Sequence, residues 1–378
     1  MVSTSRRLAC LLLGASALLA AATPFALAQD AKLRPVSLFM YSVAPDLGDA
    51  PLWIVPHALG YFADEGLQVG VEYAGGSSGA LQLLAAGKGQ FATSTPTQVM
   101  LATHQGLKIK AVLEHNRTYG SALVVPTTAN VKSIDQLRAH LKGNNIGVAS
   151  MSSGRIPYAR AWIRELGLQE DTDVKLVAVG VGPQAAAALK ADRVRALVIY
   201  DGVYAAIEAA TDVRFTRFET DWQKPLFSGV VVTTDKIVQE DPDLVVRMDR
   251  AIAKALVFAT TNPEAVVRIY WKLFPENKPA ADKEAEELKS RTVVVNSMVT
   301  NWLSGMDKPD AKWGGQSEAL WSSIQDNDRK GGLISETRPV GEYFTSAFEA
   351  KSNDFDAAAI RRQAQGYTDE MIRFSKTK

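Results

Sequence analysis

The chain has 378 residues, a formal net charge of +1, 47% hydrophobic and 22% charged residues, and a single cysteine. These values are ordinary for a soluble globular protein, and they exclude collagen-like, intrinsically disordered and disulfide-scaffold classes. At roughly 150 residues per domain, the length predicts about two domains. The sequence has no clustered Lys and Arg residues that would neutralise phosphates, so we expect no nucleic-acid partner.

The first 28 residues are typical of a secretory signal peptide. Arg6 and Arg7 precede an uncharged apolar run at residues 8–22, and the small residues at 26–28 suit cleavage by signal peptidase. The run is too short for a membrane span. Cleavage would also remove Cys10, which would leave no thiol for disulfides, catalysis or metal binding. We expect a periplasmic protein, exported by the general secretory or the twin-arginine route.

Strands and helices alternate along the next part of the chain. We predict strands at residues 36–41, 69–73 and 91–92, and helices at residues 52–62 and 80–86. Gly66 has the position of a helix C-cap, because glycine enters the left-handed conformation without steric cost.

The same order returns about 105 residues later. We predict strands at residues 146–149, 174–179 and 196–200, and helices at residues 157–166 and 185–191. This alternation predicts an α/β protein of two similar lobes, each with a parallel sheet and right-handed crossovers. We interpret residues 123–126 and 225–232 as two strands that cross between the lobes and form a hinge.

The rest of the chain is mostly helical. We predict helices at residues 244–259, 263–274 and 282–303, and no assignment for residues 304–332, which are rich in Gly, Asp and Trp. The predicted division is a first lobe of residues 29–122 and 228–378, including a helical C-terminal region, and a second lobe of residues 123–227.

One motif resembles the nucleophile elbow of α/β hydrolases. The segment Gly75-Gly76-Ser77-Ser78-Gly79 fits G-x-S-x-G and lies between a strand and a helix. That fold places several strands before the nucleophile, whereas two precede Ser77, and the last histidine of the chain is His140. We therefore favour a turn at a helix N-terminus, whose free N–H groups can hold an anion or a polar ligand.

A second motif resembles a dinucleotide-binding fingerprint. Residues 180–185 fit G-x-G-x-x-A, and Asp201 follows about 20 residues later. The following helix is short, and no further βαβ half is present to hold a second nucleotide, so we expect no cofactor. The four histidines lack metal-binding spacing, so we expect no metal site either.

Polar residues follow the first strand of the second lobe. Ser150-Met151-Ser152-Ser153-Gly154-Arg155 lies at the carboxyl end of that strand, where ligands bind in open α/β sheets. The guanidinium of Arg155 offers paired donors suited to a carboxylate, sulfonate or phosphate. Asp201, in the same expected cleft, would instead favour a cation or a hydrogen-bonding heterocycle. The sequence leaves these two ligand classes open.

Several segments resemble a known family. The Leu59-Gly60-Tyr61-Phe62-Ala63-Asp64-Glu65-Gly66-Leu67 block, the Gly75–Gly79 turn and Leu84-Ala85-Ala86-Gly87 are similar to the nitrate/sulfonate/thiamine-precursor class of ABC-transporter substrate-binding proteins. The likeness continues through Gly143-Asn144-Asn145-Ile146-Gly147-Val148 and Asn262-Pro263-Glu264-Ala265 and covers about residues 36–270. Arg195-Ala196 departs from the usual acidic-then-small pair, and the chain after Phe274 is longer than usual.

The resemblance implies a type II periplasmic binding fold that closes on a small ligand and delivers it to a membrane permease. It assigns ligand contacts to the loops after the strands, and the helix N-termini, aromatic walls and charged groups add further candidates. The predicted ligand-binding residues are Tyr41, Ser42, Trp53, Gly76, Ser77, Thr93, Ser94, Thr95, Asn116, Arg117, Ser152, Ser153, Gly154, Arg155, Tyr200 and Asp201.

We therefore expect a monomeric, non-catalytic solute-binding component of an ABC importer, which captures a small polar or anionic organic solute by hinge closure. The expected partners are the small molecule and an ABC permease. Two alternatives stay open: a protein that presents its closed, liganded form to a receptor, and an exported enzyme of the hydrolase or dehydrogenase type.

Overall fold

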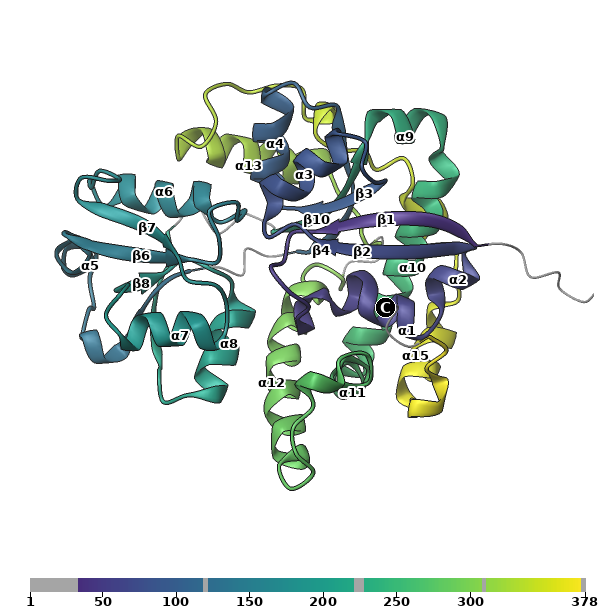
Figure 1. Ribbon diagram of the computed structural model, residues 1–378. Helices are drawn as coiled ribbons and strands as arrows, with labels where there is room; N and C mark the ends of the chain where they lie inside the picture. The colour runs from purple at the N-terminus through teal and green to yellow at the C-terminus, as the bar shows by residue number, and fades with distance from the viewer. Residues whose placement is uncertain (1–32, 118–121, 221–227, 308–310, 375–378) are drawn as a thin grey trace, which may run out of the picture. The chain divides into compact units, whose positions relative to one another are not determined.

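Two five-stranded sheets organise the computed structural model, which describes residues 33–117, 122–220, 228–307 and 311–374 (Figure 1). The predicted signal peptide, residues 1–28, lies outside the described residues. We call each sheet with its covering helices a lobe. The α/β architecture of two lobes predicted from the sequence is thereby confirmed.

The sheet of the first lobe has the strand order β2-β1-β3-β10-β4. Its strands are β1 (Arg34–Met40), β2 (Leu67–Tyr73), β3 (Phe91–Ser94), β4 (Ile109–Asn116) and β10 (Gly229–Thr234). Strand β1 runs parallel to β2 and β3, whereas β10 is inserted antiparallel between β3 and β4.

The sheet of the second lobe has the equivalent order β7-β6-β8-β5-β9. Its strands are β5 (Leu123–Pro126), β6 (Asn144–Val148), β7 (Val174–Ala178), β8 (Ala196–Leu197) and β9 (Phe215–Phe218). Strand β6 is parallel to β7 and β8, and β5 is antiparallel to β8 and β9.

The prediction of purely parallel sheets is therefore wrong, because β5 and β10 run against their neighbours. Both strands were predicted as a hinge, yet each pairs within one sheet. The chain between β4 and β5 and between β9 and β10 includes residues 118–121 and 221–227, which lie outside the described residues, so a two-stranded hinge stays a prediction. A buried apolar strand has the same sequence pattern whether it pairs parallel or antiparallel, which explains why the strand direction was predicted wrongly.

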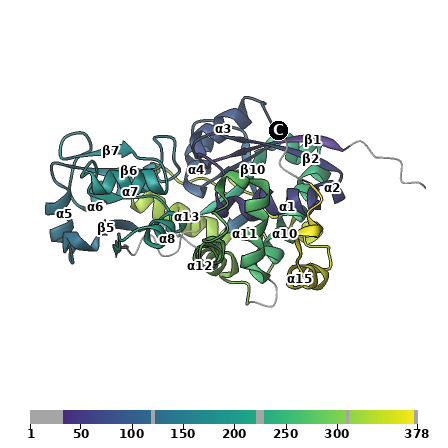
Figure 2. The same cartoon turned by 60° about the horizontal axis from the view of Figure 1, so that its bottom comes forward.

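Helices cover both faces of each sheet (Figure 1, Figure 2). In the second lobe they are α5 (Ile134–Leu141), α6 (Ile156–Glu165), α7 (Pro183–Lys190) and α8 (Asp201–Ala210). Those of the first lobe and the C-terminal region are α1 (Val55–Ala58), α2 (Tyr61–Asp64), α3 (Ser77–Ala85), α4 (Pro96–His104), α9 (Asp235–Glu240), α10 (Pro242–Thr261), α11 (Pro263–Leu273), α12 (Glu284–Leu303), α13 (Glu318–Lys330), α14 (Glu349–Ser352) and α15 (Ala357–Gln365).

The helix predicted over residues 52–62 is divided into three short pieces. A π-helical turn, Ala50–Ile54, leads into α1, and Gly60 then separates α1 from α2. Pro56 has no N–H to donate to the preceding turn, so a regular α-helix cannot run through it. Gly60 adopts a left-handed φ of 81°, which ends α1 and redirects the chain into α2.

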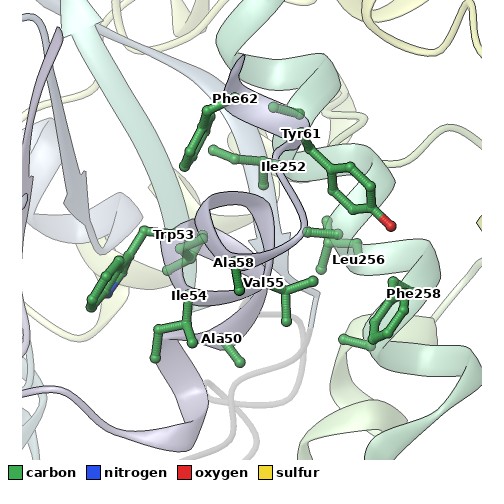
Figure 3. Close-up of a cluster of buried hydrophobic side chains, with 14 of the residues drawn as sticks. Ala50, Trp53, Ile54, Val55, Ala58, Tyr61, Phe62, Ile252, Leu256 and Phe258 are labelled. Atoms are coloured by element: carbon green, nitrogen blue, oxygen red, sulfur yellow. The ribbon is translucent and has the colours of Figure 1, made fainter. Parts of the chain in front are cut away.

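The largest buried cluster lies between the first sheet and helices α1, α10 and α11. Figure 3 shows the side chains of Ile54, Val55 and Ala58 facing Ile252 and Leu256 of α10, all of them buried. Full burial of one such aliphatic side chain contributes about 1.5–3 kcal/mol. This packing holds one face of the first sheet rigid, so the loops at the strand ends project from a fixed base.

The opposite face of the first sheet is covered by α3, α4 and α13 (Figure 1). Helix α13 lies in residues 304–332, which the sequence analysis leaves unassigned. Its Trp321 is fully buried and stacks on Phe344 with ring centroids 5.4 Å apart. The C-terminal region is therefore part of the first lobe's core. Among the described helices, none combines the length and the apolar character that a bilayer crossing requires.

Candidate functional site

A cavity with about 890 Å³ of empty space, its opening included, lies where the strand ends of the two sheets face each other. The first lobe lines it with the loop after β1, the N-termini of α3 and α4, the end of β4 and the residue before β10. The second lobe contributes the loops after β6, β7 and β8, and α12 adds Met298, Asn301 and Trp302. Ligands of open α/β sheets bind in this position.

Five buried polar atoms of the first lobe line this cavity without a hydrogen-bond partner among the described residues. They are Ser77 Oγ, Thr95 Oγ1, His115 Nε2, Asn116 Oδ1 and Ser228 Oγ. Buried polar groups in folded proteins are nearly always hydrogen-bonded, and each unsatisfied group costs about 1–3 kcal/mol. Hydroxyls and an imidazole can both donate and accept, so the wall is suited to a ligand with both kinds of group.

The imidazole of His115 is uncharged in this wall. Burial lowers the pKa of His115 to about 3, because the surroundings penalise the cationic ring. Its ring stacks on that of Tyr41, with centroids 6.2 Å apart and planes inclined by 14°. The pair forms an aromatic surface with one free ring nitrogen, which suits a planar polar solute rather than a simple anion.

Two carboxyl groups, the half-buried Asp46 and the buried Asp49, line the cavity at a short 3₁₀ turn. Asp46 accepts from Gly48 N at 2.7 Å, and Asp49 accepts from Ser42 Oγ at 2.6 Å. Burial raises the pKa of Asp49 well above its ordinary value, the nearby charge of Asp46 adds to this shift, and burial likewise raises the pKa of Asp46. Tyr200 of the second lobe donates to Asp46 Oδ2 at 2.7 Å, so this acidic pair also ties the lobes together.

Among the described residues, the wall that the second lobe contributes carries one cation. Arg155, at the N-terminus of α6, is nearly buried, and its guanidinium lies 5.8 Å from the centroid of the Tyr158 ring. Asp201 also lines the cavity, but it accepts from Arg217 Nη1 at 2.6 Å. This ion pair offsets the negative charge that would otherwise favour a cationic solute at Asp201.

The backbones of the two lobes are in direct contact beside the cavity. Ser78 N and Ser78 Oγ donate to Ser152 O at 3.3 and 3.2 Å, and Ser152 Oγ donates back to Gly75 O at 2.9 Å. Ser150 Oγ also donates to Gly75 O. A Cβ atom on Gly76 would lie 2.3 Å from the carbonyl of Ser152. Glycine at position 76 therefore permits this contact.

The structure places most of the predicted site residues in the cavity wall. Those that line it are Tyr41, Ser42, Ser77, Thr95, Asn116, Ser153, Gly154, Arg155, Tyr200 and Asp201. Those outside it are Trp53, Gly76, Thr93, Ser94, Arg117 and Ser152.

The residues outside the wall have other contacts. Trp53 is buried in the core of the first lobe, where its ring packs edge-on against that of Phe274 with centroids 5.8 Å apart and its indole Nε1 donates to Tyr73 OH at 2.9 Å. Thr93 Oγ1 accepts from Tyr41 N, Ser94 Oγ donates to Thr95 O, and Arg117 Nη1 donates to Lys312 O at 3.0 Å. Gly76 and Ser152 belong to the contact between the lobes.

Sequence reasoning missed the acidic pair and several polar groups. Asp46 and Asp49 have the three-residue spacing of a capping box: the Asp46 side chain accepts a hydrogen bond from the backbone of Asp49, and the Asp49 side chain accepts one from the backbone of Asp46. This spacing is visible in the sequence and indicates a turn at this position. His115 is not among the predicted ligand-binding residues, although it directly precedes Asn116, which is. Nothing in the local sequence indicates that α12 brings Trp302 to the cavity.

Among the described residues, neither the G-x-S-x-G segment at Ser77 nor the G-x-G-x-x-A segment at residues 180–185 is accompanied by the groups that its enzymatic reaction requires. Ser77 Oγ and His115 Nε2 both line the cavity, yet no hydrogen bond joins them among the described residues, so the elbow lacks an oriented base. Gly182 precedes α7, a helix of only eight residues. The described residues include no cluster of three or more His, Cys, Asp or Glu side chains that could hold a metal ion.

Comparison with known proteins identifies the family. The family described as NMT1/THI5 like matches residues 52–266, which is more than half of the chain. The chain belongs to the NMT1/THI5-like family. This match begins after β1 and ends in α11, so it includes the whole second lobe and its share of the cavity wall, whereas the loop after β1 and the α12 residues of the wall lie outside it.

Relatives of this NMT1/THI5-like protein include binding proteins. The riboflavin-binding protein RibY of Chloroflexus aurantiacus is 26% identical over 331 residues, which cover 84% of this chain and 86% of RibY. A protein of Bordetella bronchiseptica RB50 has a similar structure, with a TM-score of 0.66 and 19% identity over 85% of this chain and 98% of that one.

A further similar structure is the alkanesulfonate-binding protein SsuA of Xanthomonas axonopodis pv. citri bound to MOPS, with a TM-score of 0.59 and 14% identity. It covers 83% of this chain and 99% of that one. The periplasmic-binding-protein fold predicted from the sequence is thereby confirmed.

Proposed function

We propose that the protein is the solute-binding component of an ABC importer and captures a small polar solute between its two lobes. The observation that carries this proposal is the set of five buried polar atoms that line the cavity without a hydrogen-bond partner among the described residues. A solute in the cavity would satisfy them. The family membership, and the binding functions printed in the names of RibY and SsuA, support the same role.

The chemistry of the wall favours an uncharged, planar solute over an inorganic oxyanion. A site for a small oxyanion needs donors on all sides, whereas this wall includes the Asn116 Oδ1 acceptor and the carboxylates of Asp46 and Asp49. The stacked rings of Tyr41 and His115 offer an aromatic surface. Arg155 then orients a carbonyl or another acceptor of the solute. A heterocycle that carries both imide donors and carbonyl acceptors fits this description, and the name of RibY makes riboflavin the first compound to test.

Delivery of a solute requires a permease, so the proposed partner is an ABC permease in the inner membrane. The proposed location is the periplasm, which rests on the signal-like residues 1–28 and on the periplasmic-binding-protein fold. The proposed protein acts as a monomer and catalyses no reaction, because closure around a solute and its release at the permease need no bond to be broken.

The test is thermal unfolding of the purified protein in the presence of riboflavin, pyrimidines, alkanesulfonates and nitrate, followed by calorimetric titration of any compound that shifts the midpoint. A true ligand at a hundred times its Kd adds about 2.7 kcal/mol to the unfolding free energy, which shifts the midpoint by several degrees. We expect riboflavin or a pyrimidine to give this shift, and nitrate and the sulfonates to give none.

A matched pair of variants localises the binding. S77A removes one of the unpaired hydroxyls in the cavity, whereas S94A removes a buried hydroxyl that bonds Thr95 O outside it. We expect weaker binding in S77A and parent-like binding in S94A. A shift with nitrate or a sulfonate alone would contradict the proposed ligand class. An unchanged unfolding midpoint with every compound of the panel would contradict the transport role and would favour a protein partner.

A further inference from the structure

One tyrosine of the second lobe is buried in the core of the first. Tyr158 lies on α6, whose neighbouring residues Ala159 and Trp162 pack inside the second lobe. The side chain of Tyr158 is instead fully buried in the cluster formed by the first sheet, α3, α4 and α13, which includes Val99 and Trp321. This side chain therefore occupies a socket to which the C-terminal helix α13 contributes one wall.

A buried chain of hydrogen bonds ends in this socket. Thr97 Oγ1, on α4, lies 2.6 Å from Tyr158 OH and donates to Asp328 Oδ2, on α13, at 2.5 Å. A threonine hydroxyl has one proton, so the tyrosine must be the donor in the first bond. The three side chains belong to three separate elements: a helix of the second lobe, a helix of the first lobe and the C-terminal helix.

The surroundings of this chain exclude water. All three residues are fully buried, and burial raises the pKa of Asp328 to about 7, although its bond to Thr97 acts in the opposite direction. Asp328 Oδ1 has no hydrogen-bond partner among the described residues. A carboxylate is costly in such a place. Packing alone would be served better by an apolar residue, so the position of Asp328 points to a specific role in holding Thr97 and Tyr158.

Two further contacts connect the socket to the rest of the molecule. Arg164, near the end of α6, donates to Gly331 O directly after α13, which ties the same two helices at a second point. At the other end of α6, the Arg155 guanidinium lies over the Tyr158 ring and also lines the cavity. Helix α6 thus carries a contact with the cavity and a contact with α13 on neighbouring residues.

We propose that Tyr158, Thr97 and Asp328 form a closure latch, through which α13 holds the second lobe against the first. In this role the three are positioning residues, because they lie outside the cavity wall and act on a solute only through lobe closure. The latch rests on the proposed function for its purpose, since closure serves to enclose the solute. Its existence can be measured without any solute.

The experiment measures the distance between the lobes by pulsed electron paramagnetic resonance. Spin labels are attached at D135C on α5 and K236C on α9, whose side chains are 89% and 76% exposed, in a C10S background of the full chain. The latch is tested with T97V, which removes the central hydroxyl at nearly constant volume, and with Y158F, which removes only the terminal hydroxyl. T97S restores the central hydroxyl and serves as the rescue variant.

Y343F is the matched control. The hydroxyl of Tyr343 is also buried and also joins two partners, His104 Nε2 at 2.8 Å and Gln325 Oε1 at 2.7 Å. Both partners belong to the first lobe and the C-terminal region, so the loss of this hydroxyl costs a similar amount of stability without breaking a contact between lobes.

We expect T97V and Y158F to lengthen and broaden the distance distribution, with the ratio of open to closed molecules raised roughly threefold to tenfold, the factor for one lost hydrogen bond. T97S and Y343F should match the parent. Parent-like distributions in both T97V and Y158F would overturn the latch, as would an equal shift in Y343F. Because no solute is added, either result leaves the proposed function to its own test.

Discussion

The contact at Gly76 provides a sharp test of lobe closure, because one added methyl group is aimed at the facing loop. Gly76 has a φ of 162°, which is extended backbone that alanine adopts without strain. The cost of G76A is therefore steric. The new Cβ would lie 2.3 Å from the carbonyl of Ser152, so the loops must separate by roughly 1 Å to reach ordinary van der Waals contact.

The magnitude follows from the hydrogen bonds that this separation breaks. The contact includes the two bonds from Ser78 to Ser152 O and the two that Ser150 and Ser152 donate to Gly75 O. At about 1 kcal/mol for each net bond, partial or complete loss destabilises the closed form by about 2–4 kcal/mol. If the solute binds the closed form, its affinity falls by roughly 30-fold to 1,000-fold.

The assay is calorimetric titration of G76A with the solute that the panel identifies, together with thermal unfolding in the absence of solute. The unliganded midpoint should stay within about 2 °C of the parent, since the contact lies between lobes rather than in a core. G70A is the control, because the nearest heavy atom to its Cβ is Val36 O at 3.9 Å within the same lobe. Parent-like affinity in G76A would refute the reasoning that the solute binds the form in which this contact is made.

Three further predictions concern the cavity, the core and the latch. R155A should weaken solute binding by about 1.5–3 kcal/mol in calorimetric titration, which is the value of a hydrogen bond to a charged group. An unchanged Kd would show that Arg155 does not contact the solute. W53A should lower the unfolding free energy in urea by about 3–5 kcal/mol, because Trp53 packs in the core, and should leave the affinity of the folded protein for the solute unchanged. A loss of affinity would indicate that Trp53 takes part in solute binding. The pKa of Asp328 is higher in the folded protein than in the unfolded chain, so the stability that Asp328 contributes falls as the pH rises between these two values. In urea unfolding, the unfolding free energy of D328N should therefore rise by about 2–3 kcal/mol relative to that of the parent between pH 5 and pH 8. The exposed control D135N should show no such change.

The alternation of strands and helices in each lobe could be read from the sequence because its signals are local, whereas α4, α5 and α8 were not predicted. Gly66 ends a helical turn in the left-handed conformation, as its position indicates. The loops after the predicted strands do carry most of the cavity wall, since the carboxyl ends of parallel strands meet at one edge of a sheet. Ser77, Thr95 and Arg155 were identified in this way.

Strand direction was not readable, because direction depends on the route by which the chain returns. Strand β5 is antiparallel to β8 and β9, which follow it in the sequence, and β10 is antiparallel to β3 and β4, which precede it. The apolar patterns of both strands are the same as those of parallel strands. Trp53 shows the same limit for a single side chain. An aromatic residue near a loop suits a ligand wall or a core equally well, and its packing against Phe274 and Tyr73 in the buried core decides between them.

By itself, the sequence determined the α/β class, the two lobes, the family resemblance and the loops that face the cavity, because each of these depends on short-range periodicity, capping and motif order. Tertiary structure alone decided the chemistry of the site. The uncharged state of His115, the pairing of Asp201 with Arg217 and the approach of α12 each depend on which distant groups share a buried space. The latch between Tyr158, Thr97 and Asp328 has the same origin: its residues are up to 231 positions apart, and they meet only because α4, α6 and α13 converge in the folded protein.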